Sequence, residues 1–184
     1  PFSFHFLGSG TADLDGQSDP DDQEVFPSLS DTWDGALHGF LHYAYVDAHG
    51  SDTFEILRLG RQQMWETPEF VLFDGVRVET EASDEIGLEL GAYAGVPAHL
   101  YESSPAGDVV FGLMAEVEPW DSGRVRLDWM HLEDEQRLGT ERNDLLGIGV
   151  WQKLSDELRV DAAYSRLEEE DRDARVRAAW AKTD

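Results

Sequence analysis

The chain has 184 residues, enough for one domain with a sizeable core, and it has no cysteine, which excludes disulfides and thiolate metal sites. Its 39 acidic and 14 basic residues give a formal net charge of −25, so we expect no nucleic-acid partner. No apolar run approaches the roughly 20 residues that a membrane helix needs, although a membrane β-strand needs only about 9–11 alternating residues.

Residues 1–35 are predicted to form a short strand and an acidic loop. Phe2, Phe4 and Phe6 alternate with polar residues, as in a strand, and the loop that follows is rich in Gly, Pro and Ser. Its clustered carboxylates include Asp13, Asp15, Asp19 and Asp21. Such clusters are typical Ca²⁺ ligands, but the spacing does not match an EF-hand loop. We expect a solvated loop, with a calcium site as the alternative and no other cofactor.

Residues 36–184 are almost entirely strand-like. Two strands at 54–62 and 70–81 set the pattern, because Val76 and Val78 fall on one side of the second strand while Arg77 and Glu79 fall on the other. The same period recurs near residues 37–46, 86–94, 109–117, 124–129, 146–151, 158–165 and 175–180. Residues 133–142 offer the one modest helix candidate. Short turns alternate with longer acidic loops, which favours an antiparallel up-and-down meander.

The alternation has two interpretations. A soluble sheet would bury the apolar face and solvate the charged face, whereas a membrane barrel would turn the apolar face to lipid and the charged face to its lumen. Arginines and carboxylates recur on the polar faces of many strands in nearly equal numbers, which favours the barrel. We predict that nine of these residues line the lumen: Arg58, Arg77, Glu79, Glu89, Glu116, Arg126, Asp128, Arg159 and Arg177.

Aromatic residues near strand ends also favour the barrel. The apolar faces carry Leu, Val, Ile and Ala at strand centres and aromatic residues towards the ends, as in the interfacial girdles of membrane barrels. The aromatic residues in question are Tyr43, Tyr45, Trp129, Tyr164 and Trp180. A β-sandwich would more often place its large aromatics mid-strand. In segment 37–46 we assign Tyr43 and Tyr45 to the same face as Leu41.

Signals for catalysis and metal binding are weak. The sequence has no GxSxG, HExxH, P-loop or GxGxxG motif. Glu89 and Glu116 could form a carboxylate pair of the kind that glycosidases use, but such pairs arise by chance in any Glu-rich sheet. We therefore predict that the protein is not an enzyme. His38 and His42 have the spacing of helical metal ligands, but in a strand they lie about 13 Å apart. Tryptophans in turns and rims indicate either carbohydrate contact or packing: Trp33, Trp65, Trp120 and Trp151.

Two short motifs carry a family resemblance. RLGRQ at 58–62 followed by FDGVRVE at 73–79 resembles the GRQ…DGVR pattern of Gram-negative outer-membrane porin-like barrels, including alginate-export-type channels. The stretches 123–135 and 143–180 are similar to hairpins of such barrels, so the resemblance covers residues 36–182. It implies an antiparallel up-and-down transmembrane β-barrel, with about ten strands in this chain. Barrels of this family have more strands and a more basic lumen, which leaves open that the chain is a fragment of a larger barrel.

The resemblance implies a location in the outer membrane of a Gram-negative bacterium, surrounded by lipid. The main hypothesis is a channel for passive passage or export of a small or polymeric solute. A second hypothesis is a barrel that acts as a scaffold or sheath for a periplasmic redox or secretion partner. The third is a soluble acidic β-sandwich that binds glycans with calcium. A periplasmic protein or a second copy of the chain is a further partner to consider.

Overall fold

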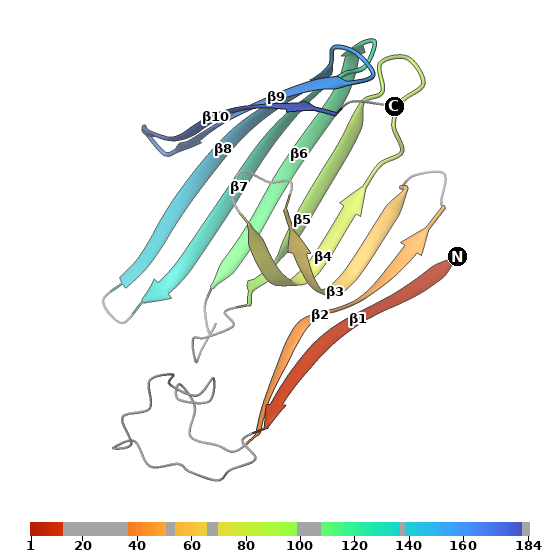
Figure 1. The fold of residues 1–184 in the computed structure, drawn as a ribbon. Helices are drawn as coiled ribbons and strands as arrows, with labels where there is room; N and C mark the ends of the chain where they lie inside the picture. Colours follow the sequence, from red (N-terminus) through yellow and green to blue (C-terminus); the bar gives the residue numbers. More distant parts are fainter. Residues whose placement is uncertain (13–36, 51–53, 66–69, 99–107, 137–138, 182–184) are drawn as a thin grey trace.

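The computed structural model describes residues 1–12, 37–50, 54–65, 70–98, 108–136 and 139–181. Ten antiparallel strands form one sheet, and each strand pairs with its neighbours in sequence (Figure 1). Their bounds are β1 Phe2–Ala12, β2 Leu37–His49, β3 Ile56–Met64, β4 Val71–Glu79, β5 Glu89–Pro97, β6 Val109–Trp120, β7 Gly123–Gln136, β8 Gly139–Lys153, β9 Leu158–Leu167 and β10 Glu170–Trp180. The predicted all-β, up-and-down order of ten strands is confirmed.

Two features differ from expectation. The helix candidate at 133–142 is wrong, because β7 and β8 continue as a paired hairpin from Glu133↔Arg142 to Gln136↔Gly139. The sheet is also open, since β1 and β10 are its two edges and are not paired with each other. The described strands make a single sheet, whereas a sandwich needs two. Among the described residues there is no helix long and apolar enough to cross a membrane.

The N-terminal strand belongs to the same sheet as the rest of the chain. β1 pairs along β2, from Phe2↔Ala48 to Ala12↔Leu37. The acidic loop lies outside the described residues, and with it the four calcium candidates Asp13, Asp15, Asp19 and Asp21. The calcium site therefore stays a prediction.

The strand register divides the side chains between two faces. We call one the apolar face; a row of apolar residues crosses eight strands of it, namely Phe2, Ala48, Leu57, Val78, Ala92, Leu113, Trp129 and Leu146. We call the other the charged face; the adjacent row there is Ser3, Asp47, Arg58, Arg77, Tyr93, Gly112, Met130 and Leu145. Neighbouring rows alternate because successive side chains of a strand point to opposite faces.

Burial is inverted relative to a soluble sheet. On the apolar face Leu59, Leu113 and Leu127 are 65%, 55% and 54% exposed. On the charged face Arg126 and Asp47 are only 2% and 3% exposed. The polar face is therefore the inside of this curved sheet and the apolar face is its outside.

A row of glycines bends the sheet at β3, β4 and β5. Gly60 lies opposite Gly75, and Gly75 lies opposite Gly95. A Cβ atom added to Gly75 would lie 2.1 Å from the Ala94 carbonyl oxygen, and one added to Gly60 would lie 2.3 Å from that of Ala44. Gly60 also has a φ of +128°, which L side chains rarely adopt. The neighbouring backbones approach this closely only because the row has no side chains.

Beyond this glycine row the ends of β3 and β4 fold over the charged face. We call residues 60–65 and 70–75 the inner hairpin; in Figure 1 it lies in front of β5 to β7. Its Met64, Val71 and Phe73 form one buried apolar cluster with Tyr93, Val110, Met130 and Leu145 of β5 to β8. β4 and β8 are four strands apart, about 19 Å within a sheet. Phe73 and Leu145 therefore share a core because the hairpin crosses the sheet.

A β-bulge changes the facing of β2. Leu7 lies opposite Tyr43 while Gly8 lies opposite Leu41, so β2 has one extra residue between them. Leu41 and Tyr43 consequently face opposite sides, and Tyr45 lies on the charged face. Its ring stacks on His5 at 4.8 Å and lies 3.9 Å from the Arg58 guanidinium carbon. The assignment of Tyr43 and Tyr45 to the face of Leu41 was therefore wrong.

The glycine row predicts a position-specific effect of a single methyl group. Gly75→Ala should lower the free energy of unfolding by about 1–3 kcal/mol, because the new Cβ meets backbone that cannot move aside. Gly39→Ala in β2 is the matched control, since nothing lies within 4 Å of its added Cβ. It should change stability by less than about 0.5 kcal/mol. Urea unfolding of the two variants beside the unchanged protein measures both effects. Equal effects would contradict the role of the row.

Candidate functional site

The charged face carries a ladder of ion pairs that begins at β2 and β3. Arg58 Nε donates to Asp47 Oδ1 at 2.7 Å and Arg58 Nη2 donates to Asp47 Oδ2 at 2.9 Å. This bidentate geometry is the strongest that an arginine and a carboxylate can form. His5 and His49 flank the same carboxylate, with their Nε2 atoms 3.7 Å and 3.9 Å from Asp47 Oδ2. Asp47 is thus a buried anion surrounded by cationic and polar partners.

The next step of the ladder places two cations side by side. Arg58 and Arg77 are directly opposite each other in the β3–β4 register, an arrangement that destabilises a sheet unless it is compensated. Compensation comes from both sides, since Arg58 pairs with Asp47 and Arg77 Nε donates to Glu79 Oε1 at 2.7 Å. Each guanidinium therefore has its own carboxylate.

A second cluster joins β6 and β7. Arg126 Nε lies 3.0 Å from Asp128 Oδ1, and Arg126 Nη1 lies 4.0 Å from Glu116 Oε2. Arg124 Nη1 donates to the other oxygen of Glu116 at 3.2 Å. Two arginines and two carboxylates thus form one alternating network, and the Arg126 side chain is almost completely buried within it.

All nine predicted lumen residues lie on the charged face, as their register shows. Six of them take part in the pairs above. Arg177 pairs with Asp161, with Arg177 Nε 2.8 Å from Asp161 Oδ2. Glu89 lies opposite Glu116, and the exposed Arg159 lies opposite Ala179. The prediction did not include Asp47, although its alternation with Tyr45 and His49 in β2 is a signal that sequence reasoning could have used.

A pocket of about 270 Å³ lies between the charged face and the inner hairpin. Trp65 lines it from the hairpin, and Arg124, Trp151, Ser165 and Arg175 line it from β7 to β10. Two of the four tryptophans singled out from the sequence thus meet in one cavity, whereas Trp120 lies at the β6–β7 turn and Trp33 lies outside the described residues. Sequence reasoning could not bring them together, because it did not predict the inward fold of the hairpin.

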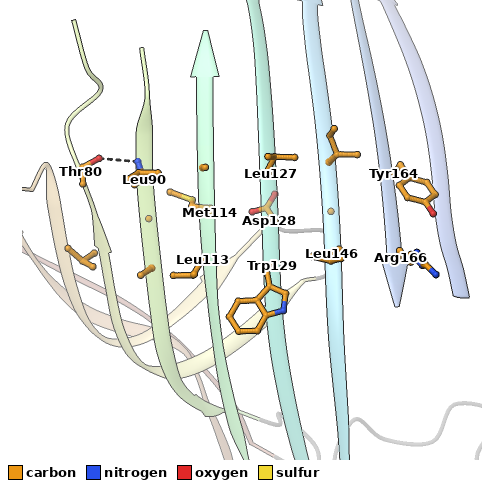
Figure 2. A pocket seen from close by; sticks show the side chains of 16 residues that line it. Thr80, Leu90, Leu113, Met114, Leu127, Asp128, Trp129, Leu146, Tyr164 and Arg166 are labelled. Carbon is orange, nitrogen blue, oxygen red and sulfur yellow. Dashed lines mark hydrogen bonds between the residues drawn. The ribbon is translucent and has the colours of Figure 1, made fainter. Parts of the chain in front are cut away.

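The apolar face has a hollow of a different character. It has a volume of about 740 Å³ and crosses β4 to β9. Figure 2 shows Leu90, Leu113, Leu127 and Leu146 along it, with Thr80 and Arg166 at its two sides. Its walls are mostly apolar side chains, so the hollow matches an apolar ligand better than a polar one.

The described residues offer no candidate metal site. Across the part of the chain that the structure describes, no group of three or more His, Asp or Glu side chains is placed to hold a metal ion. His42 of β2 instead shares a hydrogen bond of 2.9 Å with Ser9.

No protein-family model matches the chain, and neither curated proteins nor solved structures give a match. The two faces of the sheet are therefore the features of the molecule that bear on its function.

Two arginines allow a matched test of the buried ladder. Arg126 and Arg175 both pair with an aspartate two residues away at 3.0 Å, but the first pair is buried and the second is about half exposed. Arg126→Met should destabilise the protein by about 3–5 kcal/mol, because Asp128 keeps a buried charge without its partner. Arg175→Met should cost at most about 1 kcal/mol. If urea unfolding gave both variants the same loss in the free energy of unfolding, burial of an ion pair would not determine how much that pair stabilises the protein.

Proposed function

We propose that this chain forms all or part of an outer-membrane β-barrel, with its apolar face in lipid and its charged face along a solute pathway. The observation that carries the proposal is the inverted burial of the sheet. Soluble monomers rarely expose a contiguous apolar patch larger than a few hundred Å². Here an apolar row crosses eight strands, and its Leu57, Leu113 and Leu146 are exposed, while the charged face behind it buries Asp47, Glu79, Arg126 and Asp128.

The dimensions of the apolar face suit a bilayer. β6 alone presents five apolar residues to that face, at 109, 111, 113, 115 and 117, which span about 27 Å along the strand. The apolar band of outer-membrane barrels is about 25 Å tall. A tilted membrane strand needs about 9–11 residues, and the described strands, which have 9 to 15, are long enough.

Both ends of the apolar face carry amphipathic side chains. One row beyond Leu113 and Trp129, towards one end of the face, His131 lies opposite Asp144; Asp144 Oδ1 accepts from Trp129 Nε1 at 3.1 Å and lies 2.9 Å from His131 Nδ1. At the other end Trp180 Nε1 donates to Glu157 Oε2 at 3.2 Å. Indole rings with an apolar body and a hydrogen-bonded N–H are typical of the membrane–water interface. These ends support the proposed placement in a bilayer.

The charged face would line the pathway with both signs of charge. Because Arg58, Arg77, Arg124, Arg126 and Arg177 each have a carboxylate close by, this part of the lining has little excess of either sign, unlike the basic lumen that a channel for a polyanion needs. A pathway of this kind suits a small polar solute with weak ion selectivity. Closure of the pathway requires partners for β1 and β10, either each other or further strands.

A second candidate function is a barrel that acts as a scaffold around a partner. The inner hairpin favours it, because Phe73 and Met64 occupy part of the space in front of the charged face. Such a barrel would conduct little. Single-channel recording in a planar bilayer separates the two candidates, since the channel gives discrete conductance steps and the scaffold gives none.

The lipid placement makes a prediction about two residues of β6 on the apolar face. Leu113→Arg, at the centre of the apolar band, should lower the stability of the liposome-inserted protein by about 2–4 kcal/mol, whereas Val109→Arg, near its end, should cost about 0–1 kcal/mol. In water an exposed Leu→Arg change is nearly neutral. A neutral Leu113→Arg variant that still folds in liposomes would contradict the proposal.

The solute pathway makes a prediction about ion selectivity. Arg177 on the charged face and Arg142 at the edge of the apolar face are exposed to similar extents and both pair with a carboxylate. Arg177→Glu should shift the reversal potential towards cation permeation, because it replaces a positive charge of the lining by a negative one. Arg142→Glu should leave the reversal potential unchanged. A shift of equal size in both variants would argue against the charged face as the lining.

A further inference from the structure

We propose that the pocket between Trp65 and Trp151 is a binding subsite for a neutral, hydroxyl-rich ring of the size of one pyranose unit. The inference rests on the proposed function, because it identifies the class of solute that the pathway would carry. It starts from two indoles that different parts of the sheet bring to one cavity, together with arginine and aspartate side chains.

The walls of the pocket come from elements that are distant in sequence. Trp65 ends the β3 arm of the inner hairpin, where its ring packs against Phe70 at a centroid distance of 4.5 Å. Trp151 stands on β8, with the Arg124 guanidinium carbon 4.4 Å from its ring centroid. Arg175 and Arg177 of β10 line the same cavity. A solute in this pocket would therefore lie between the hairpin and the sheet, on the proposed pathway.

The charge of the lining favours a neutral ligand. Each of its arginines already has a carboxylate partner, at 3.2 Å for Arg124 and Glu116, 3.0 Å for Arg175 and Asp173, and 2.8 Å for Arg177 and Asp161. The guanidinium charges are thus compensated before a ligand enters. An anionic ligand would have to compete with these carboxylates, and a cation would have to approach three arginines.

The hydrogen-bonding groups match hydroxyls. A paired guanidinium keeps N–H donors and a paired carboxylate keeps acceptor lone pairs, so the pocket presents donors and acceptors side by side, with the Ser165 hydroxyl among its lining groups. A hydroxyl group donates and accepts at the same time, so a ring with neighbouring hydroxyls can satisfy both kinds of group.

The two indoles and the volume of the pocket further restrict the class of ligand. The face of an aromatic ring is electron-rich and attracts the C–H groups of a sugar ring, which are weakly positive. Trp65 is 70% exposed, so much of its surface is available to a ligand. The volume of about 270 Å³ is just below the roughly 300–1,000 Å³ of pockets for drug-sized ligands, which suits a single ring better than an oligomer.

The test is equilibrium binding of methyl α-glucopyranoside to the full chain folded in detergent micelles, measured by calorimetry. We expect saturable binding in roughly the millimolar range. Trp65→Ala and Trp151→Phe should each weaken it at least fivefold. The control Trp180→Ala, which removes an exposed indole of the apolar face, should leave it unchanged. Sodium glucuronate, a pyranose that carries a carboxylate, should bind no more tightly than the neutral glucoside.

Three results would overturn the subsite: no saturable binding of the glucoside, glucuronate binding more than tenfold tighter, or identical affinities in the Trp65→Ala, Trp151→Phe and Trp180→Ala variants. The micelle experiment needs no bilayer, so its outcome is separate from that of the conductance test. Conductance without glucoside binding would remove the subsite and keep the channel. Glucoside binding without conductance would remove the channel and leave a sugar-binding protein.

Discussion

The ion pairs of the charged face are the constraint on which the rest of the structure depends. A buried guanidinium or carboxylate is tolerated only with a partner, and here the partners stand on neighbouring strands or two residues along the same strand. Because the pairs satisfy one another, the charged face can turn inwards. The apolar side chains of the same strands then necessarily point outwards, since side chains alternate along a strand.

The alternation of side chains allowed much of the fold to be predicted. Val76 and Arg77 fall on opposite faces as the period of two requires, and ten strands follow in the predicted order. Prediction failed where the period was interrupted. The bulge in β2 between Leu41 and Tyr43 separated Tyr43 and Tyr45 from the face of Leu41. The polar segment at 133–142, which resembles a helix in composition, pairs as a hairpin because β7 and β8 are already in register.

The inner hairpin could not be predicted because it depends on contacts that are distant in sequence. Gly60, Gly75 and Gly95 are unremarkable in the sequence and become a row only when β3, β4 and β5 pair. That row lets Phe73 reach Leu145 of β8 and brings Trp65 to the pocket that Trp151 lines. The individual residues of the candidate site were therefore largely predictable, whereas the cavity that they form was not.

The most direct test of the account is the lipid accessibility of β6. The chain has no cysteine, so single cysteines introduced at positions 109 to 117 can each be spin-labelled without background. In liposomes the account predicts that accessibility to membrane-dissolved oxygen alternates, with maxima at 109, 111, 113, 115 and 117 and minima between them. Uniformly low oxygen accessibility, or maxima at 110, 112, 114 and 116, would contradict the assignment of the apolar face to lipid.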